Sequence, residues 1–301
     1  MNEKINDVLL GTNQNTAEVP NENQVTPQQI ETDVRFLFEA YTEENVTDAN
    51  FDVKPELITL LGLEEYGKST FVGSFYHILR TREEVSGYRL IDSDTITGFE
   101  RRLYLRKLNE AGKSDVKRTR RKKGSLLNVI LMDCKENSRH IMLSDGAGET
   151  YRDCQSDNAI VREQIAVKAA NRLLIFVNCD EFNNPTKPWK EDLKTLLKRF
   201  NDNEMLPNDA LIYIVLNKFD RAKDIVNDKL NSYIQEVKTI VELYFTVSED
   251  NIFRVNSKGL SMEDADNGLE NLIETILKPI PENRNAYKKI DWITNAIKES
   301  K

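Results

Sequence analysis

The sequence predicts a three-layer α/β fold built on a mostly parallel β-sheet, and three observations lead to that prediction. From residue 56 onward, short apolar runs alternate with longer amphipathic stretches. The apolar runs are continuous, as in strands that are buried on both faces. The amphipathic stretches repeat their apolar residues at helical spacing. Strands and helices that alternate in this way form parallel sheets covered by helices, which bind ligands at the carboxyl ends of the strands.

The predicted elements follow this alternation. The apolar runs predict strands at 57–61, 126–132, 140–144, 173–178, 211–217 and 252–256. The amphipathic stretches predict helices at 69–80, 158–171, 189–200, 230–244 and 269–277. We expect residues 55–279 to form the main domain.

The two ends of the chain differ from this pattern. Residues 1–54 are rich in Asn, Gln, Glu and Thr, which predicts a flexible tail with one short docking helix at 34–41, where apolar residues gather. At the other end, prolines interrupt the pattern before an amphipathic segment at 287–298. We expect residues 280–301 to form a C-terminal helix that packs on the domain or contacts a partner.

Composition and charge exclude several classes of function. The 301 residues include 39% hydrophobic side chains, enough for one substantial core. A formal net charge of −8 disfavours general affinity for nucleic acid or anionic membranes, although a local basic patch could override it. No stretch reaches the ~20 apolar residues that a bilayer span requires, and the start lacks the pattern of a signal peptide. We therefore expect a cytoplasmic protein.

Cysteine and histidine usage gives no sign of a metal site. Cys134, Cys154 and Cys179 are odd in number and lack CxxC spacing, so the sequence predicts reduced thiols. His77 and His140 are the only histidines and are far apart in sequence. They offer little basis for metal coordination or for His-based nucleophilic catalysis.

A phosphate-binding loop is predicted between the first strand and the first helix. Residues 62–69 read Gly-Leu-Glu-Glu-Tyr-Gly-Lys-Ser, which matches GxxxxGK followed by Ser or Thr. In such loops backbone N–H groups surround the β-phosphate, Lys68 would neutralise phosphate oxygens, and Ser69 would offer its hydroxyl to Mg²⁺. A chance match should occur in about 1% of chains of this size. The nucleotide-binding residues expected here are Gly62, Glu65, Tyr66, Gly67, Lys68, Ser69 and Thr70.

A second motif follows the strand at 140–144. Residues 145–149 read Asp-Gly-Ala-Gly-Glu, which has the form DxxG. Asp145 can hold the hydration shell of Mg²⁺, and the N–H of Gly148 can approach the γ-phosphate. In isolation the segment could be an ordinary Asp-Gly turn. Its position after a phosphate-binding loop favours the nucleotide interpretation.

A third motif, Asn-Lys-Phe-Asp at 217–220, closes the fifth predicted strand and can separate guanine from adenine. The Asp220 carboxylate can accept hydrogen bonds from N1–H and the exocyclic amine of guanine, two donors that adenine does not present together. Asn217 is expected to brace the loop, and the stem of Lys218 is expected to lie along the base. A weaker motif ends the last predicted strand, where a backbone N–H could reach guanine O6 from Asn256, Ser257 or Lys258.

These four segments, in this order, resemble the translation-factor-related and Ras-like (TRAFAC) class of P-loop GTPases from about residue 56 to residue 277. More narrowly, the GKST helix start, the stretch 87–106 with its Ser-Asp-Thr and Phe-Glu-Arg-Arg segments, and the DGAGE segment resemble the bacterial double-GTPase subgroup. The resemblance implies a Ras-like GTPase fold and a Mg²⁺-dependent molecular switch that binds GTP and GDP. It also implies a protein partner, either a second GTPase or an effector, in bacterial conflict or defence systems.

The chain between the first predicted helix and the strand at 126–132 is longer than in a minimal Ras-like domain. This stretch must contain the switch threonine that senses the γ-phosphate. The resemblance places that role at Thr119, because the family's switch threonine lies shortly upstream of the matching strand. Thr95 and Thr97 are the alternatives.

Thr119 lies within the basic run Lys-Arg-Thr-Arg-Arg-Lys-Lys at 117–123. The simplest interpretation is a solvated basic loop. A sharper interpretation is that one of its arginines approaches the transferring phosphate from within the same chain. Nucleic-acid binding is a weaker alternative, because the run has no interleaved aromatic residues and the rest of the chain is acidic.

Glu149 stands where Ras-like enzymes have a water-orienting glutamine. Its carboxylate could polarise water, but it also brings negative charge near the γ-phosphate, so we expect slow unassisted hydrolysis. The expected catalytic residues are Lys68, Glu149 and Thr119. The expected metal ligands are Ser69, Thr119 and Asp145.

The sequence leaves three functional hypotheses. The leading one is a guanine-nucleotide switch with slow, Mg²⁺-dependent GTP hydrolysis, in which loss of the γ-phosphate releases the loops around Thr119 and Asp145. The second is a nucleotide-bound scaffold that does not hydrolyse GTP and whose tails bind a partner. The third, an ATP-driven enzyme, is disfavoured by Asp220 in the base motif.

Overall fold

The structure is a computed structural model that describes residues 39–43, 45–46, 51, 54–110, 125–184, 186–222, 224–257 and 268–280. The chain divides into two compact units, Met1–Val34 and Arg35–Lys301, and all described residues belong to the second. The predicted helix at 287–298 lies outside the described residues, as does most of the docking helix predicted at 34–41.

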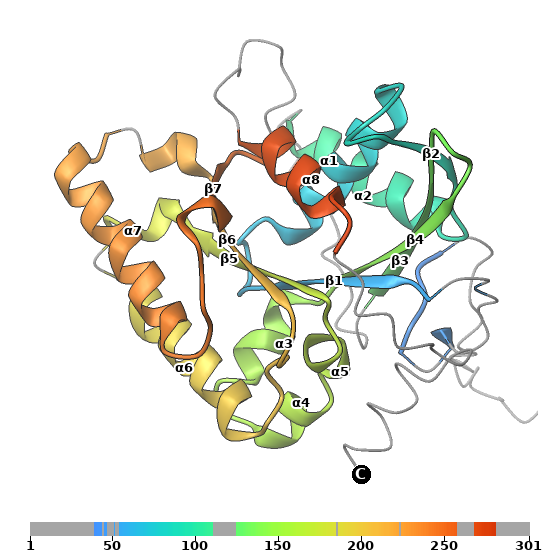
Figure 1. The fold of residues 1–301 in the computed structure, drawn as a ribbon. Helices are drawn as coiled ribbons and strands as arrows, with labels where there is room; N and C mark the ends of the chain where they lie inside the picture. Colours follow the sequence, from blue (N-terminus) through green and yellow to red (C-terminus); the bar gives the residue numbers. More distant parts are fainter. Residues whose placement is uncertain are drawn as a thin grey trace, which may run out of the picture. The chain divides into compact units, whose positions relative to one another are not determined.

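A seven-stranded sheet with the order β2-β3-β4-β1-β5-β6-β7 forms the core of the second unit (Figure 1). The pairs β4–β1, β1–β5, β5–β6 and β6–β7 are parallel, whereas β2–β3 and β3–β4 are antiparallel. The prediction of a mostly parallel sheet is therefore confirmed. The strands are β1 Glu56–Leu61, β2 Tyr88–Asp92, β3 Ser125–Asp133, β4 Ser138–Asp145, β5 Arg172–Asn178, β6 Leu211–Asn217 and β7 Ile252–Val255.

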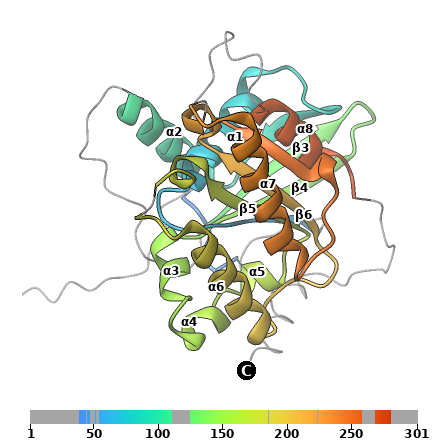
Figure 2. The same ribbon diagram turned by 90° about the vertical axis from the view of Figure 1, so that its left-hand side faces the viewer.

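Helices cover both faces of the sheet, which gives the three layers that the sequence predicts (Figure 1, Figure 2). α1 and α8 lie on one face, with α2 packed against α1. α3, α4, α5 and α6 lie on the other face, with α7 beside α6. The helices are α1 Lys68–Thr81, α2 Ile96–Glu110, α3 Gly148–Asp153, α4 Asn158–Arg162, α5 Ile165–Lys168, α6 Trp189–Asp202, α7 Asn227–Glu242 and α8 Leu269–Leu277.

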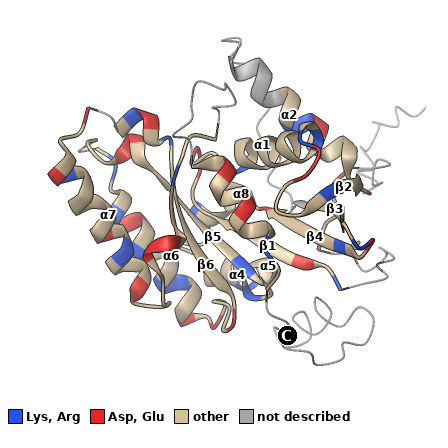
Figure 3. Ribbon diagram, turned by 45° about the horizontal axis from the view of Figure 1, so that its top comes forward, with Lys and Arg blue, Asp and Glu red and all other residues tan. Residues whose placement is uncertain are grey.

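Burial of apolar side chains explains why these segments form strands and helices. Every residue of β5 is buried, and α6 buries Leu193, Leu196, Leu197 and Phe200 along one side. Complete burial of one such side chain contributes about 1.5–3 kcal/mol. Acidic and basic residues are interspersed along α6 and α7 (Figure 3), as expected of helices with one solvated face. Within the described ranges, no helix combines the length and the apolar character needed to cross a bilayer.

The single helix predicted at 158–171 is wrong. This stretch forms two short helices, α4 and α5, with a break at residues 163–164. The break lets the Ala166 carbonyl accept a hydrogen bond from the Thr59 hydroxyl of β1 at 2.6 Å. On one continuous helix the buried residues Val161 and Ala166 would point about 140° apart, so they could not both face the core.

β2 and α2 form an insertion between α1 and β3 that the sequence-based elements did not include. α2 packs on α1 through the stacked rings of Tyr76 and Phe99, whose centroids are 4.9 Å apart. A Cβ on Gly73 of α1 would lie 3.2 Å from the carbonyl carbon of Arg102. The insertion is therefore held tightly beside the helix that follows the predicted phosphate loop.

Part of the predicted N-terminal tail contacts the sheet. Tyr41 and Leu126 exchange backbone hydrogen bonds of 2.8 and 2.7 Å at the edge of β3. Tyr41, Val46 and Phe51 are buried in a cluster with Leu57. The domain boundary at residue 54 stays a prediction, although buried contacts begin before it.

Candidate functional site

The four motif segments follow the carboxyl ends of β1, β4, β6 and β7, which lie in neighbouring parts of the sheet. Ligands bind α/β sheets at this edge. Thr70 lies in the first turn of α1 and Asn256 directly after β7, and both are partly buried. The sections of chain that the sequence singled out are therefore brought to one edge by the fold.

The predicted phosphate loop joins β1 to α1 and contains two residues with left-handed backbone conformation. These are Glu65, with φ of 64°, and Gly67, with φ of 84°. A Cβ on Gly67 would lie 2.1 Å from Nδ2 of Asn217, so this position excludes any side chain. Loops in which left-handed residues alternate with others gather backbone N–H groups into an anion-binding concavity.

Lys68 is buried within this loop, with 5% of its surface exposed. Its Nζ donates to the carbonyls of Gly62 at 2.5 Å and Leu63 at 3.0 Å, and lies 5.4 Å from the centroid of the Tyr151 ring. Burial lowers the pKa of Lys68 to about 8, although neighbouring carboxylates favour the charged form. A phosphate group at the loop would provide the negative charge that a buried ammonium needs.

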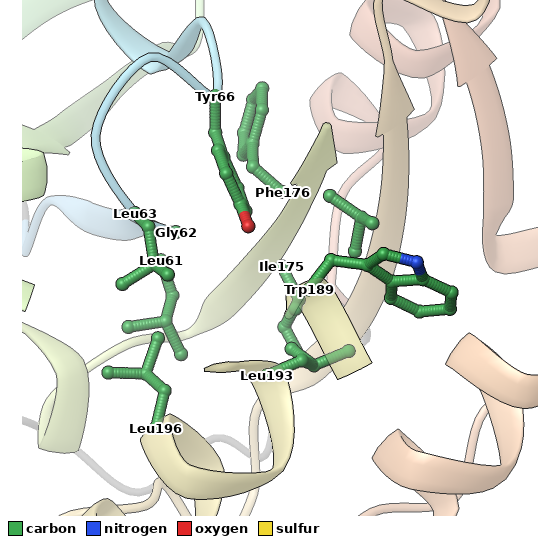
Figure 4. A pocket seen from close by; sticks show the side chains of 10 residues that line it. Leu61, Gly62, Leu63, Tyr66, Ile175, Phe176, Trp189, Leu193 and Leu196 are labelled. Atoms are coloured by element: carbon green, nitrogen blue, oxygen red, sulfur yellow. The ribbon is translucent and has the colours of Figure 1, made fainter. Parts of the chain in front are cut away.

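A narrow apolar pocket under the loop fixes its backbone to the core (Figure 4). Leu61, Phe176 and Trp189 contribute to its walls, and Tyr66 of the loop points into it. The Tyr66 hydroxyl donates to the Glu181 carboxylate at 3.0 Å, and burial together with that carboxylate raises the pKa of Tyr66. The Tyr66–Glu181 hydrogen bond therefore anchors the loop, and the apolar lining of the pocket does not suit a charged ligand.

Asp145, at the end of β4, is held through both carboxylate oxygens. Ser69 Oγ donates to Oδ1 at 3.0 Å, and Arg102 Nε donates to Oδ2 at 2.7 Å. The Asp145 side chain is 0% exposed and the Arg102 side chain 7%. The structure thus brings together two of the predicted metal ligands, Ser69 and Asp145, and adds a buried arginine to them.

The DxxG segment lies directly against the phosphate loop. Gly148 begins α3, and a Cβ at this position would lie 2.4 Å from the Cα of Glu64. Only glycine permits such an approach. Glu149 is partly buried in the first turn of α3 and acts electrostatically on Lys68. The predicted catalytic carboxylate is therefore close enough to influence the phosphate loop.

Asn217 joins the phosphate loop to the loop after β7. Its Nδ2 donates to the Tyr66 carbonyl at 2.7 Å, and its Oδ1 accepts from the N–H and the hydroxyl of Ser257 at 3.1 and 2.9 Å. The Ser257 carbonyl accepts from the Ser74 hydroxyl of α1 at 2.6 Å. The side chain therefore connects the phosphate loop to the loop after β7, and its role in nucleotide binding stays a prediction.

Lys218 and Asp220 follow this brace. Lys218 has a left-handed φ of 55°, and burial, with a smaller contribution from Arg221, lowers its pKa. Asp220 lies in the short 3-10 helix Phe219–Ala222 and is exposed. Its carboxylate is therefore accessible to a base that approaches from solvent.

Two predicted site residues, Thr119 and Lys258, lie outside the described residues, as does the basic run at 117–123. Of the alternatives to Thr119, Thr97 is exposed on α2, whereas Thr95 is buried.

Thr95 has a structural role in this conformation. Its Oγ1 accepts from the backbone N–H of Asn128 at 2.8 Å and donates to the Asn128 carbonyl at 3.2 Å. These bonds fix the start of α2 against β3, so the Thr95 hydroxyl is engaged in contacts that hold the fold together. The choice of Thr119 over Thr95 as the switch residue stays a prediction.

Sequence reasoning missed Arg102, Tyr151 and Ser74. Arg102 reaches Asp145 across 43 positions of sequence, which no local pattern records. A predicted helix at this insertion could have assigned Arg102 to the buried side, because Phe99 and Leu103 are both buried and Arg102 lies on the same side of α2 as they do.

The sequence matches the family Double-GTPase 2 over residues 56–277. The chain belongs to the Double-GTPase 2 family. The matched region runs from β1 to α8 and includes all four motif segments, so the fold is that of a P-loop GTPase. No curated protein matches the chain.

Among solved structures, the chain has weak similarity to Roco2 RocCORdC of Methanosarcina barkeri bound to GDP, with 14% identity and a TM-score of 0.38 over 76% of this chain and 50% of that chain. It is similar to the same degree to a mutation variant of SsGBP, with 13% identity and a TM-score of 0.38 over 74% of this chain and 54% of that chain. This Double-GTPase 2 member thus spans about half the length of the structures that it matches.

Asn217→Ala is expected to weaken GDP and GTP binding by a similar factor, about 10- to 1,000-fold, because it removes three hydrogen bonds worth ~0.5–1.5 kcal/mol each. Both affinities can be measured by equilibrium titration with a fluorescent GDP analogue and competition by GTP. Asn203→Ala removes local bonds at the end of α6 and should leave both affinities unchanged. Unchanged affinity in the Asn217 variant, or a loss confined to GTP, would contradict the bracing role.

Proposed function

We propose that this Double-GTPase 2 member is a molecular switch that binds GTP and GDP with Mg²⁺ and hydrolyses GTP slowly. The observation that carries the proposal is that the motif loops are joined by direct contacts at one edge of the sheet. Ser69 bonds Asp145, Asn217 bonds both Tyr66 and Ser257, and Gly148 lies against the phosphate loop. Such an arrangement can surround the phosphates and the base of one nucleotide.

The residues at the end of β4 fit a magnesium ion. The Ser69 hydroxyl and the Asp145 carboxylate lie 3.0 Å apart at the start of α1. Mg²⁺ usually keeps several waters and takes one or two protein oxygens together with substrate phosphates, so this pair is sufficient. When bound, the ion would neutralise charge on the β- and γ-phosphates. Thr119 is the proposed third ligand, present only in the triphosphate state.

Guanine selection is assigned to Asp220. Its exposed carboxylate follows Asn217 and Lys218 at the end of β6, and a base paired with it would satisfy both oxygens. Adenine would leave this acceptor unpaired at the site, which disfavours ATP. The backbone around Ser257 and Lys258 is the proposed contact of guanine O6.

The proposal of slow hydrolysis is based on Glu149, the residue after the DxxG glycine. Glu149 acts on Lys68 and brings a second negative charge toward the γ-phosphate, where Ras-like enzymes have a neutral amide. We therefore propose that Lys68 stabilises the transferring phosphate, that Thr119 senses it, and that a partner protein accelerates the reaction. The partner is a second GTPase or an effector, and a role in bacterial conflict or defence rests on the family resemblance alone.

A nucleotide-bound scaffold is the second candidate function. The glutamate in place of glutamine favours it, because a site without a water-orienting amide can retain GTP for long periods. Single-turnover release of phosphate from bound GTP separates the two candidates: release on the timescale of minutes to hours supports the switch, and its absence supports the scaffold.

Asp220→Asn should lower affinity for GTP and raise affinity for xanthosine triphosphate, because an amide can donate where xanthine carries a carbonyl. Competition against a fluorescent GDP analogue measures both changes. Asp228→Asn, at the exposed start of α7, is the matched control and should bind as the wild type does. A variant that keeps full preference for GTP over xanthosine triphosphate would remove Asp220 from the base site.

Glu149→Gln should keep or raise a basal hydrolysis rate that we expect at ~10⁻⁴–10⁻² per second, because the amide orients water without adding charge. Single-turnover phosphate release measures the rate, and Glu163→Gln, exposed after α4, is the control. A fall of about 100-fold in the Glu149 variant would instead identify Glu149 as a general base.

A further inference from the structure

The buried ion pair between Arg102 and Asp145 is not explained by the proposed function. It joins the inserted helix α2 to the end of β4 at 2.7 Å, and both side chains are nearly inaccessible, with 7% and 0% exposed. Burying two charges costs desolvation energy that good geometry must offset, so such pairs are not a default means of stabilising a fold. A buried arginine on the proposed metal-site carboxylate therefore calls for a specific role.

Each oxygen of Asp145 already accepts a hydrogen bond from within the protein. Ser69 Oγ donates to Oδ1 and Arg102 Nε donates to Oδ2, so the guanidinium lies directly against the carboxylate that a metal shell would use. A divalent ion placed beside the same carboxylate would meet the positive guanidinium at short range, where charge repulsion is strong because the site is buried. The arginine and the ion therefore compete for Asp145.

Arg102 can leave Asp145 without unfolding its helix. α2 itself is fixed by the Tyr76–Phe99 ring stack and by the close contact at Gly73. Within the part of the chain that the structure describes, the guanidinium has one further bond, from Nη1 to the Gly98 carbonyl one turn earlier in α2, at 3.0 Å. Rotation of a long side chain on a fixed helix is sufficient to exchange the contact.

We propose that Arg102 is an internal competitor for the magnesium site: in the nucleotide-free protein its guanidinium takes the place of the ion's charge on Asp145, and Mg²⁺ loading with nucleotide displaces it. The inference rests on the proposed function, because it requires that Ser69 and Asp145 hold Mg²⁺. Its consequence is that the Mg²⁺ concentration needed to retain nucleotide is the intrinsic value divided by the fraction of molecules in which Arg102 does not occupy Asp145.

The test measures how free Mg²⁺ slows dissociation of N-methylanthraniloyl-GDP from the full chain. Arg102→Gln should lower the half-maximal Mg²⁺ concentration at least fivefold, whereas the charge-preserving Arg102→Lys should remain near the wild-type value. Arg101→Gln is the matched control, because Arg101 is the adjacent residue, is 54% exposed and pairs with Glu39 at 3.6 Å. An unchanged midpoint in Arg102→Gln, or a higher one, would overturn the proposal, and a higher one would make Arg102 a ligand of the nucleotide instead.

A second measurement on the wild-type chain covers the case in which Arg102→Gln does not fold. The Nε–H resonance of Arg102, assigned with Arg102→Lys, should be protected from solvent exchange in the nucleotide-free protein and with GDP in EDTA, and should lose protection when Mg²⁺ and GDP are both present. Protection that persists with Mg²⁺ contradicts displacement. Failure of the wild type to bind the GDP analogue at any Mg²⁺ concentration would count against the proposed function, whereas normal binding without these effects would count only against the role of Arg102.

Discussion

Asn217 makes three hydrogen bonds with one side chain, and through them the loop after β1 is fixed to the loop after β7. These loops would hold the two ends of a nucleotide, so their separation must be set before the ligand arrives. The close fit between Asn217 and Gly67 ties the brace to the backbone conformation of the phosphate loop. Because a buried amide that loses a partner leaves polar groups unsatisfied, this contact also resists small shifts of either loop. The geometry of the site therefore depends on it.

The charged side chains that would contact a nucleotide and its ion have hydrogen-bond partners within the protein. Lys68 bonds loop carbonyls, and Asp145 bonds Ser69 and Arg102. These contacts keep buried charges from being left unpaired, and a bound nucleotide with its ion would replace them one by one. These contacts thus indicate what a ligand must offer at each residue: negative charge for Lys68 and positive charge for Asp145.

Most of the fold and the motif positions could be predicted from sequence, because they depend on local patterns. Continuous apolar runs gave the parallel strands, and the spacing from Gly62 to Ser69 identified the loop between β1 and α1. The break at residues 163–164 could not be predicted from local periodicity, which does not record that Ala166 contacts Thr59 of β1, more than 100 positions away. The contact of Arg102 was missed for the same reason. Arg102 belongs to the Phe-Glu-Arg-Arg segment at 99–102 that carries the family resemblance, but its partner is known only once α2 is placed on α1.

The proposed function requires that the site select a guanine nucleotide. The most direct measurement is displacement of a fluorescent GDP analogue from the wild-type chain by GTP, GDP and ATP at saturating Mg²⁺. The account predicts that GTP and GDP displace it at concentrations at least about 100-fold below ATP, because only guanine pairs both oxygens of Asp220. Displacement by ATP at the same concentration as GTP would contradict it.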